Sequence, residues 1–284
     1  MKLVRRIFNF YLDASVHVAA SVFCLLEITA LLLDITINQN LAYFCFFSTI
    51  ACYNFIKYGV EAKKYILVVN KYHKSIQVFS FLAMAFAVYF AFFLHKDVWY
   101  CMFALGVFTA IYTLPVLPKA KNLRSFGALK VFMVAIVWAG VTVLLPVLSA
   151  NMDLSADVWI ETFQRFLIVL ILLMPFEIRD LAYDSPSLRT IPQRFGVIHT
   201  KLTTGVVVLI FFFTTYLKET ITPLDLIAKG ILFLSFGFLV LYTQGKQTKY
   251  FASFWVEAIP IAWLLIVYLV DYFIHLHFLA LVSS

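Results

Sequence analysis

The sequence has few charged residues and few cysteines for its length. Only 13% of its 284 residues are Asp, Glu, Lys or Arg, whereas 63% are hydrophobic. This composition excludes an ordinary soluble domain and indicates a polytopic membrane protein. The cysteines stand singly in apolar stretches, with no Cys-x-x-Cys or Cys/His pairing. Their spacing indicates neither disulfides nor a zinc site, and we expect small buried side chains instead.

The sequence also lacks a linker rich in Pro or Ser, a low-complexity tract and a charged tail. We therefore expect one membrane domain over residues 1–284. Apolar stretches of roughly 17–22 residues recur along it, and a helix of that length crosses the hydrocarbon core. They predict an all-α fold of nine transmembrane helices in a single bundle, with cytoplasmic loops capping a central cavity. The expected spans lie near 15–34, 41–58, 77–94, 98–117, 127–148, 160–178, 203–217, 224–243 and 256–275.

Basic residues are distributed unevenly over the predicted connections. Of the 22 Lys and Arg residues, the side opposite the N-terminus keeps only Lys96, Arg165, Lys218 and Lys229. Loops rich in Lys and Arg stay in the cytoplasm, so the bias places the N-terminus in the cytoplasm and the C-terminus outside. The first span lacks a small-residue cleavage site after it, and we expect it to be a retained anchor.

Three carboxylates, Glu177, Asp180 and Asp184, lie close together at the end of the sixth predicted span. If the helix continues, their spacing puts them on one face. Acids at the mouth of a membrane helix repel one another unless a cation lies among them. Mg2+ held by carboxylate oxygens and completed by phosphate satisfies this need. The alternative is a loop at the membrane edge whose charges only face water and lipid headgroups.

A longer pattern surrounds these acids. Residues 177–184 read Glu-Ile-Arg-Asp-Leu-x-x-Asp, followed by Arg-Thr-Ile-Pro at 189–192 and Phe-Gly at 195–196. The pattern resembles the second acidic motif of UbiA-type intramembrane prenyltransferases, because the acids, the Thr-x-Pro and the Gly keep that family's order and spacing. The family's layout of nine spans, with long cytoplasmic loops after the second and sixth, is also similar. The resemblance therefore covers nearly the whole chain.

The family's first acidic motif, Asn-Asp-x-x-Asp-x-x-x-Asp, is altered in this chain. At the end of the second predicted span the chain keeps Asn54 and Glu61 but none of the aspartates. In one register apolar and aromatic residues replace the acids. Shifted by one residue, Asn54, Lys57 and Glu61 occupy the acidic positions and share one helical face, and we favour this register. Lys57 and Glu61 alternatively form an ordinary ion pair at a helix end.

Further polar residues lie outside the two motifs. Lys119 and Arg124, between the fourth and fifth spans, resemble the family's Tyr…Lys-Arg connection, and their donors can hold phosphate oxygens. Glu27 and Glu257 lie inside predicted helices. Such carboxylates are either functional or paired within the bundle.

The resemblance implies transfer of a prenyl group from a prenyl diphosphate to a lipophilic, aromatic acceptor within the membrane. The expected partners are these two substrates and membrane lipids, and no nucleic acid. Catalytic roles fall to Asp180, Asp184 and Lys57, Mg2+ ligands are Glu177, Asp180 and Asp184, and the diphosphate contacts Lys119, Arg124, Arg179 and Asn54. We expect the ammonium of Lys57 to stand in for one metal ion. The missing aspartates favour an alternative, a non-catalytic UbiA-like descendant that binds a lipid or isoprenoid or supports a partner membrane enzyme.

Overall fold

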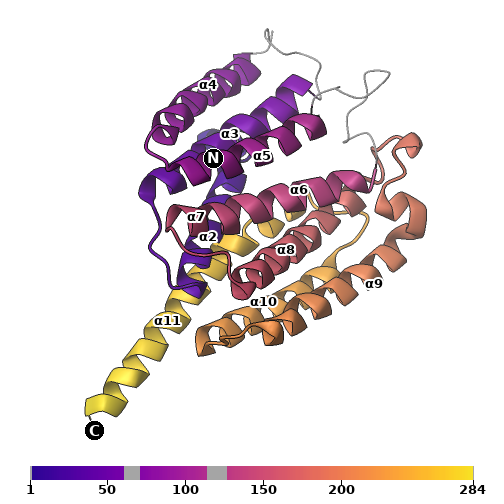
Figure 1. Cartoon of the computed structure of the whole chain (residues 1–284). Coiled ribbons are helices and arrows are strands. Elements are labelled where there is room, and N and C mark those ends of the chain that lie inside the picture. The colour runs from indigo at the N-terminus through magenta and orange to yellow at the C-terminus, as the bar shows by residue number, and fades with distance from the viewer. Residues whose placement is uncertain (1, 61–70, 114–126, 284) are drawn as a thin grey trace.

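The described part of the chain consists of helices joined by short connections (Figure 1). The computed structural model describes residues 2–60, 71–113 and 127–283, and these residues contain no β-strand, as the sequence predicts. In chain order the elements are α1 (Lys2–Asp13), α2 (Val16–Leu32), α3 (Gln39–Asn54), η1 (Phe55–Val60), α4 (Lys71–Ala91), α5 (Lys96–Thr113), α6 (Leu129–Ala139), η3 (Gly140–Leu144), α7 (Leu145–Ser149), α8 (Ala156–Asp180), η4 (Pro186–Leu188), α9 (Ile191–Phe213), η5 (Thr214–Leu217), α10 (Pro223–Tyr242), η6 (Phe251–Val256) and α11 (Ile259–Ser283).

Several of these helices have the length and composition of membrane spans. Among the described residues, six helical segments are long and apolar enough to cross a membrane. A seventh is added if α1 and α2, which meet at a bend of 57°, count as one crossing. These features are those of an integral, multi-pass membrane protein. Each of the nine predicted stretches overlaps a helix, while nine crossings and the orientation of the termini stay predictions.

Two apolar clusters hold the bundle together. The main one joins α2, α8, α9, α10 and α11, and its side chains Leu25, Ile171 and Phe236 are fully buried. The second one joins α2 and α3 to α5 and α7 around Leu26 and Leu41. In Figure 1, α9 runs along α8, and α10 runs along α9. Side chains of both clusters also form the walls of the cavity described below.

A network of charged side chains is buried where α8, α10 and η5 meet. The ammonium of Lys229 lies 2.7 Å from Glu161 and 2.9 Å from Asp225. Lys218 lies 3.2 Å and 2.8 Å from the same two carboxylates. Arg165, also buried, donates to the Leu25 carbonyl oxygen at 2.7 Å and lies 3.7 Å from Glu161.

The burial of this network adds to the sequence interpretation. Lys218, Lys229 and Arg165 were counted on the outer side, and the structure shows that their charges lie inside the protein and are compensated by carboxylates. Lysines in loops bias topology, whereas buried, paired lysines stabilise helix packing. Lys96 is then the one residue of that set that stays exposed.

Candidate functional site

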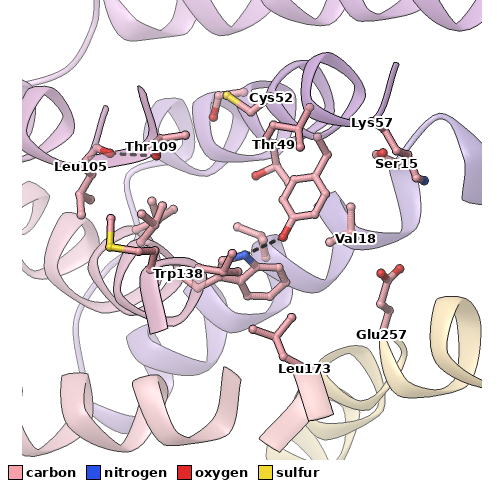
Figure 2. Close-up of a pocket in the computed structure, with 18 of the residues that line it drawn as sticks. Ser15, Val18, Thr49, Cys52, Lys57, Leu105, Thr109, Trp138, Leu173 and Glu257 are labelled. Atoms are coloured by element: carbon pink, nitrogen blue, oxygen red, sulfur yellow. Dashed lines mark hydrogen bonds between the residues drawn. The ribbon is translucent and has the colours of Figure 1, made fainter. Parts of the chain in front are cut away.

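An apolar cavity of about 570 Å³ lies in the half of the bundle that contains α3, α5 and α6 (Figure 2). Its walls come from α2, α3, α5, α6, α8 and the segment before α11. Val18, Leu105 and Leu173 are among the apolar lining residues, and Figure 2 shows them around one open space. Cavities of this size and character hold small apolar ligands.

Two aromatic side chains contact each other across the wall of this cavity. The indole nitrogen of Trp138 on α6 donates a 2.8 Å hydrogen bond to the hydroxyl oxygen of Tyr53 on α3. Their rings are 6.4 Å apart and nearly perpendicular. The bond fixes both rings at the cavity, where a ring face can attract a cation.

The cavity is polar at one end. Lys57, Arg179, Asp180 and Glu257 all line it, although they come from η1, the end of α8 and the turn before α11. Figure 2 shows Glu257 pointing into the open space from the side opposite Lys57. The carboxylate of Glu257 forms no ion pair within 4 Å in the described part of the chain, but the charges of Lys57 and Arg179 act on it. The polar end therefore holds two cations and two carboxylates, and an apolar cavity that ends in this way suits an amphiphilic ligand with a charged head.

Three π-helical segments contribute to the cavity wall: η1, η3 and η6. They present Lys57, Val141 and Ser253, respectively. A π-helical turn widens the helix and redirects side chains, which is a frequent feature of functional sites. At Gly140, where η3 begins, a Cβ would lie 2.6 Å from a methyl carbon of Leu105 on α5. Glycine therefore allows α5 and α6 to approach closely beside the cavity.

The carboxylates of the acidic motif are divided between two cations. Glu177 accepts from the ammonium of Lys130 at 2.8 Å, and Asp184 lies 3.4 Å from the same nitrogen. Asp180 instead receives two hydrogen bonds from the guanidinium of Arg179, at 2.7 Å and 3.2 Å. The shared helix face was expected only if the helix continued past Asp180, and this condition is not met, because α8 ends at Asp180 and the chain then turns.

These pairings bear on the expected Mg2+ site. Mg2+ requires a near-octahedral set of oxygens, most of them free of competing cations. The described residues contain no group of three or more His, Cys, Asp or Glu side chains that could hold a metal ion. Lys130 and Arg179 already contact the carboxylates of Glu177, Asp180 and Asp184 and compensate two of their three negative charges. In this arrangement the three acids do not fit Mg2+.

The turn that carries Asp184 is held from two sides by contacts to its backbone. Gln193 accepts from the Thr190 N–H at 3.0 Å, which caps the start of α9, and its amide donates to the carbonyl oxygens of Asp184 and Ser185. On the other side, Gly127 has φ +44°, and a Cβ there would overlap the carbonyl oxygens of the 188–189 backbone. These contacts place the start of α6, and hence Lys130, against the acidic turn.

The structure brings only some of the predicted residues to the cavity. Lys57, Arg179 and Asp180 line it, whereas Glu177 and Asp184 are not among its lining residues. Asn54 does not line it. The amide of Asn54 is buried and accepts from Ser15 at 2.8 Å while donating to the Ala14 carbonyl oxygen and the Ser80 hydroxyl, so the bonds that hold α2, α3 and α4 together already occupy it. Glu61, Lys119 and Arg124 lie outside the described residues.

Other site residues escaped the sequence interpretation. The partnership of Lys130 with the acids is visible only in the structure, although a lysine in the first turn of an apolar helix is itself a signal of a buried partner. Tyr53 and Trp138 look like ordinary packing residues in a sequence that contains 31 Phe and 15 Tyr. Glu257, by contrast, is one of the two carboxylates inside predicted helices that the sequence analysis singled out.

No protein-family model and no curated protein matches the sequence. The fold does match solved structures of a UbiA homologue from Archaeoglobus fulgidus. The one bound to GPP and Mg2+ matches with a TM-score of 0.59 and 10% identity, over 91% of this chain and 99% of that chain. The one bound to DMAPP and Mg2+ gives 0.58 and 10%, over 91% and 98%. The one bound to Cd2+ gives 0.56 and 12%, over 91% and 98%. The chain therefore has the UbiA-type fold, which confirms the resemblance predicted from the acidic motif.

Proposed function

We propose that this chain transfers a prenyl group from a prenyl diphosphate to a lipophilic, aromatic acceptor within the membrane. The observation that carries the proposal is the apolar cavity that ends at Lys57 and Arg179. The isoprenoid chain would lie along the apolar walls and the diphosphate would meet the two cations. The matched homologue structures with GPP and DMAPP support this class of substrate.

The chemistry begins with heterolysis of the bond between the prenyl C1 and the diphosphate oxygen. The diphosphate leaves with the electron pair, and Lys57 and Arg179 stabilise its developing charge. Arg179 can do so with a fork of donors, whereas Lys57 acts as a point charge. The remaining allylic cation faces the rings of Tyr53 and Trp138, and the apolar walls keep water away from it.

The acceptor then closes the cycle. An aromatic ring supplies an electron pair to the prenyl carbon, a new carbon–carbon bond forms, and the ring loses a proton. We assign Glu257 as the proton acceptor, because its carboxylate faces the cavity and forms no ion pair within 4 Å in the described part of the chain. Asp180 holds the guanidinium of Arg179 in place through its two hydrogen bonds and acts as a positioning residue.

A cavity-filling variant tests the proposal directly. Gly106 lines the cavity, and a Cβ added there meets no atom within 4 Å. The Cβ of Gly106→Phe therefore has room, and the ring should fill part of the cavity and reduce binding of geranyl diphosphate about tenfold or more. Gly205→Phe is the matched control, since a Cβ there is equally free but the residue does not line the cavity. Equal loss of binding in both variants, or in neither, would contradict the assignment of the cavity.

A turnover assay distinguishes a prenyltransferase from the alternative, a non-catalytic protein that binds an isoprenoid. The purified chain in lipid nanodiscs should release diphosphate from geranyl diphosphate when an aromatic acceptor is present, with the prenylated product identified by mass spectrometry. Lys57→Gln and Arg179→Gln should slow this release. Tight binding without any turnover, over a panel of acceptors, would instead favour a non-catalytic isoprenoid-binding protein, which the lost aspartates of the first motif also favour. The same assay with Mg2+ and with EDTA tests the expected role of the metal.

A further inference from the structure

The acidic motif of this chain already contains a cation. The ammonium of Lys130 lies between Glu177 and Asp184, 2.8 Å from one and 3.4 Å from the other. Both side chains of this pair are sheltered from water, since that of Lys130 is 17% exposed and that of Glu177 only 7%. The attraction between opposite charges is strong where water is excluded. A divalent ion that enters here must therefore displace the ammonium or bind next to its positive charge, which repels the ion.

Lys130 is not a lining residue of the cavity, but its neighbours on the same face of α6 are. Met133 and Val134, one helical turn further along α6, line the cavity wall, as does Asp180, three residues after Glu177 on α8. An ammonium has three donors, and two of them are directed to carboxylates. The third donor remains for an oxygen of a ligand at the polar end of the cavity.

We propose that Lys130 is a built-in cation that takes the place of a divalent ion at the second acidic motif. Divalent ions then bind this motif only when Lys130 is removed. The part of the proposal that concerns prenyl diphosphate rests on the proposed function: the ammonium, rather than a metal ion held by Glu177 and Asp184, faces the diphosphate. The occupation of the motif by Lys130 stands on its geometry alone.

The first test measures divalent ions without any substrate. Lys130→Gln leaves Glu177 and Asp184 without their cation, so Mg2+ should raise the melting temperature of this variant, and Mn2+ should give a bound signal in electron paramagnetic resonance. The wild-type chain should show neither effect. The balanced double variant, Lys130→Gln/Glu177→Gln, removes one charge of each sign and so keeps the net charge of the site unchanged. It should again bind no divalent ion. Lys246→Gln, an exposed lysine, is the control.

The second test measures binding of geranyl diphosphate in nanodiscs, with Mg2+ and with excess EDTA. EDTA should weaken binding by less than about threefold in the wild type and by about tenfold or more in Lys130→Gln, where Mg2+ restores it. Wild-type binding that disappears in EDTA would overturn the inference and leave the proposed function intact. Lys130→Gln that ignores divalent ions in both tests would also overturn it. Failure of both proteins to bind geranyl diphosphate under any condition would refute the proposed function, while a Mg2+ response confined to Lys130→Gln would still support the inference.

If Lys130→Gln does not fold, the balanced double variant decides the question. It should bind geranyl diphosphate more weakly than the wild type in EDTA, and Mg2+ should not restore its affinity. Wild-type affinity in the double variant would overturn the proposal.

Discussion

Replacing Lys229 by Met should destabilise the protein far more than replacing an exposed lysine. The Lys229 ammonium is fully buried and contacts Glu161, Asp225 and the amide oxygen of Gln164 at 2.7 Å, 2.9 Å and 2.7 Å. Methionine has nearly the same length and fills the same space. The variant therefore removes the charge and the hydrogen bonds while leaving a cavity of little volume.

The magnitude follows from the partners that remain. Lys218 and Arg165 still face Glu161, and Lys218 still lies 2.8 Å from Asp225, so no buried carboxylate is left without a cation. The variant instead removes short charged hydrogen bonds and leaves the buried amide oxygen of Gln164 without this donor, and losing a buried hydrogen-bond partner costs about 1–3 kcal/mol. For a chain of this size we expect a fall in melting temperature of roughly 2–12 °C.

The measurement is thermal unfolding of the purified protein in one detergent, followed by intrinsic fluorescence. Lys246→Met, at an exposed position, is the control and should melt within about 2 °C of the wild type. Lys229→Met/Asp225→Asn should cost less than the sum of its two single variants, because it removes a charge of each sign and leaves Glu161 with Lys218 and Arg165. A melting temperature for Lys229→Met that equals the control would show that the network does not stabilise the bundle.

Three further predictions concern the site and the topology. Glu257→Gln should lower kcat about 100-fold without changing the affinity for geranyl diphosphate, because the amide cannot accept the acceptor's proton; an unchanged kcat would remove Glu257 from the mechanism. Gly127→Ala should lower the melting temperature by several degrees and weaken binding, since the added Cβ overlaps the 188–189 carbonyl oxygens, whereas Gly205→Ala should do neither. A reporter fused after residue 284 should be accessible only from outside, and one inserted between residues 61 and 70 only from the cytoplasm; accessibility of both from the cytoplasm would contradict the predicted orientation.

The site at the end of α8 shows what local sequence can and cannot determine. The spacing of Glu177, Asp180 and Asp184 identifies the stretch, and the Thr-x-Pro pattern marks the start of α9, because caps and prolines act within a few residues of one another. The same spacing does not reveal that α8 ends at Asp180. The turn after it is held by Gln193 and by the backbone around Gly127, which are contacts between segments.

The sequence by itself determined the class of the molecule and the positions of its helices. Composition and the length of the apolar stretches decide these, since a backbone in lipid must satisfy its own hydrogen bonds and only helices of sufficient length do so within one segment. The acidic pattern was sufficient to predict the UbiA-type fold, which the structural match confirms.

The tertiary structure alone decided which charges meet. Lys130 precedes Asp184 by 54 residues and Lys229 follows Glu161 by 68, so neither pairing has a local signal. The sequence alone does not show whether a lysine lies in a loop or in the interior. Only the packing of the helices decides whether its ammonium contacts water or a carboxylate. For that reason the cavity with its polar end, the buried network and the cation inside the acidic motif became visible only when the helices were assembled.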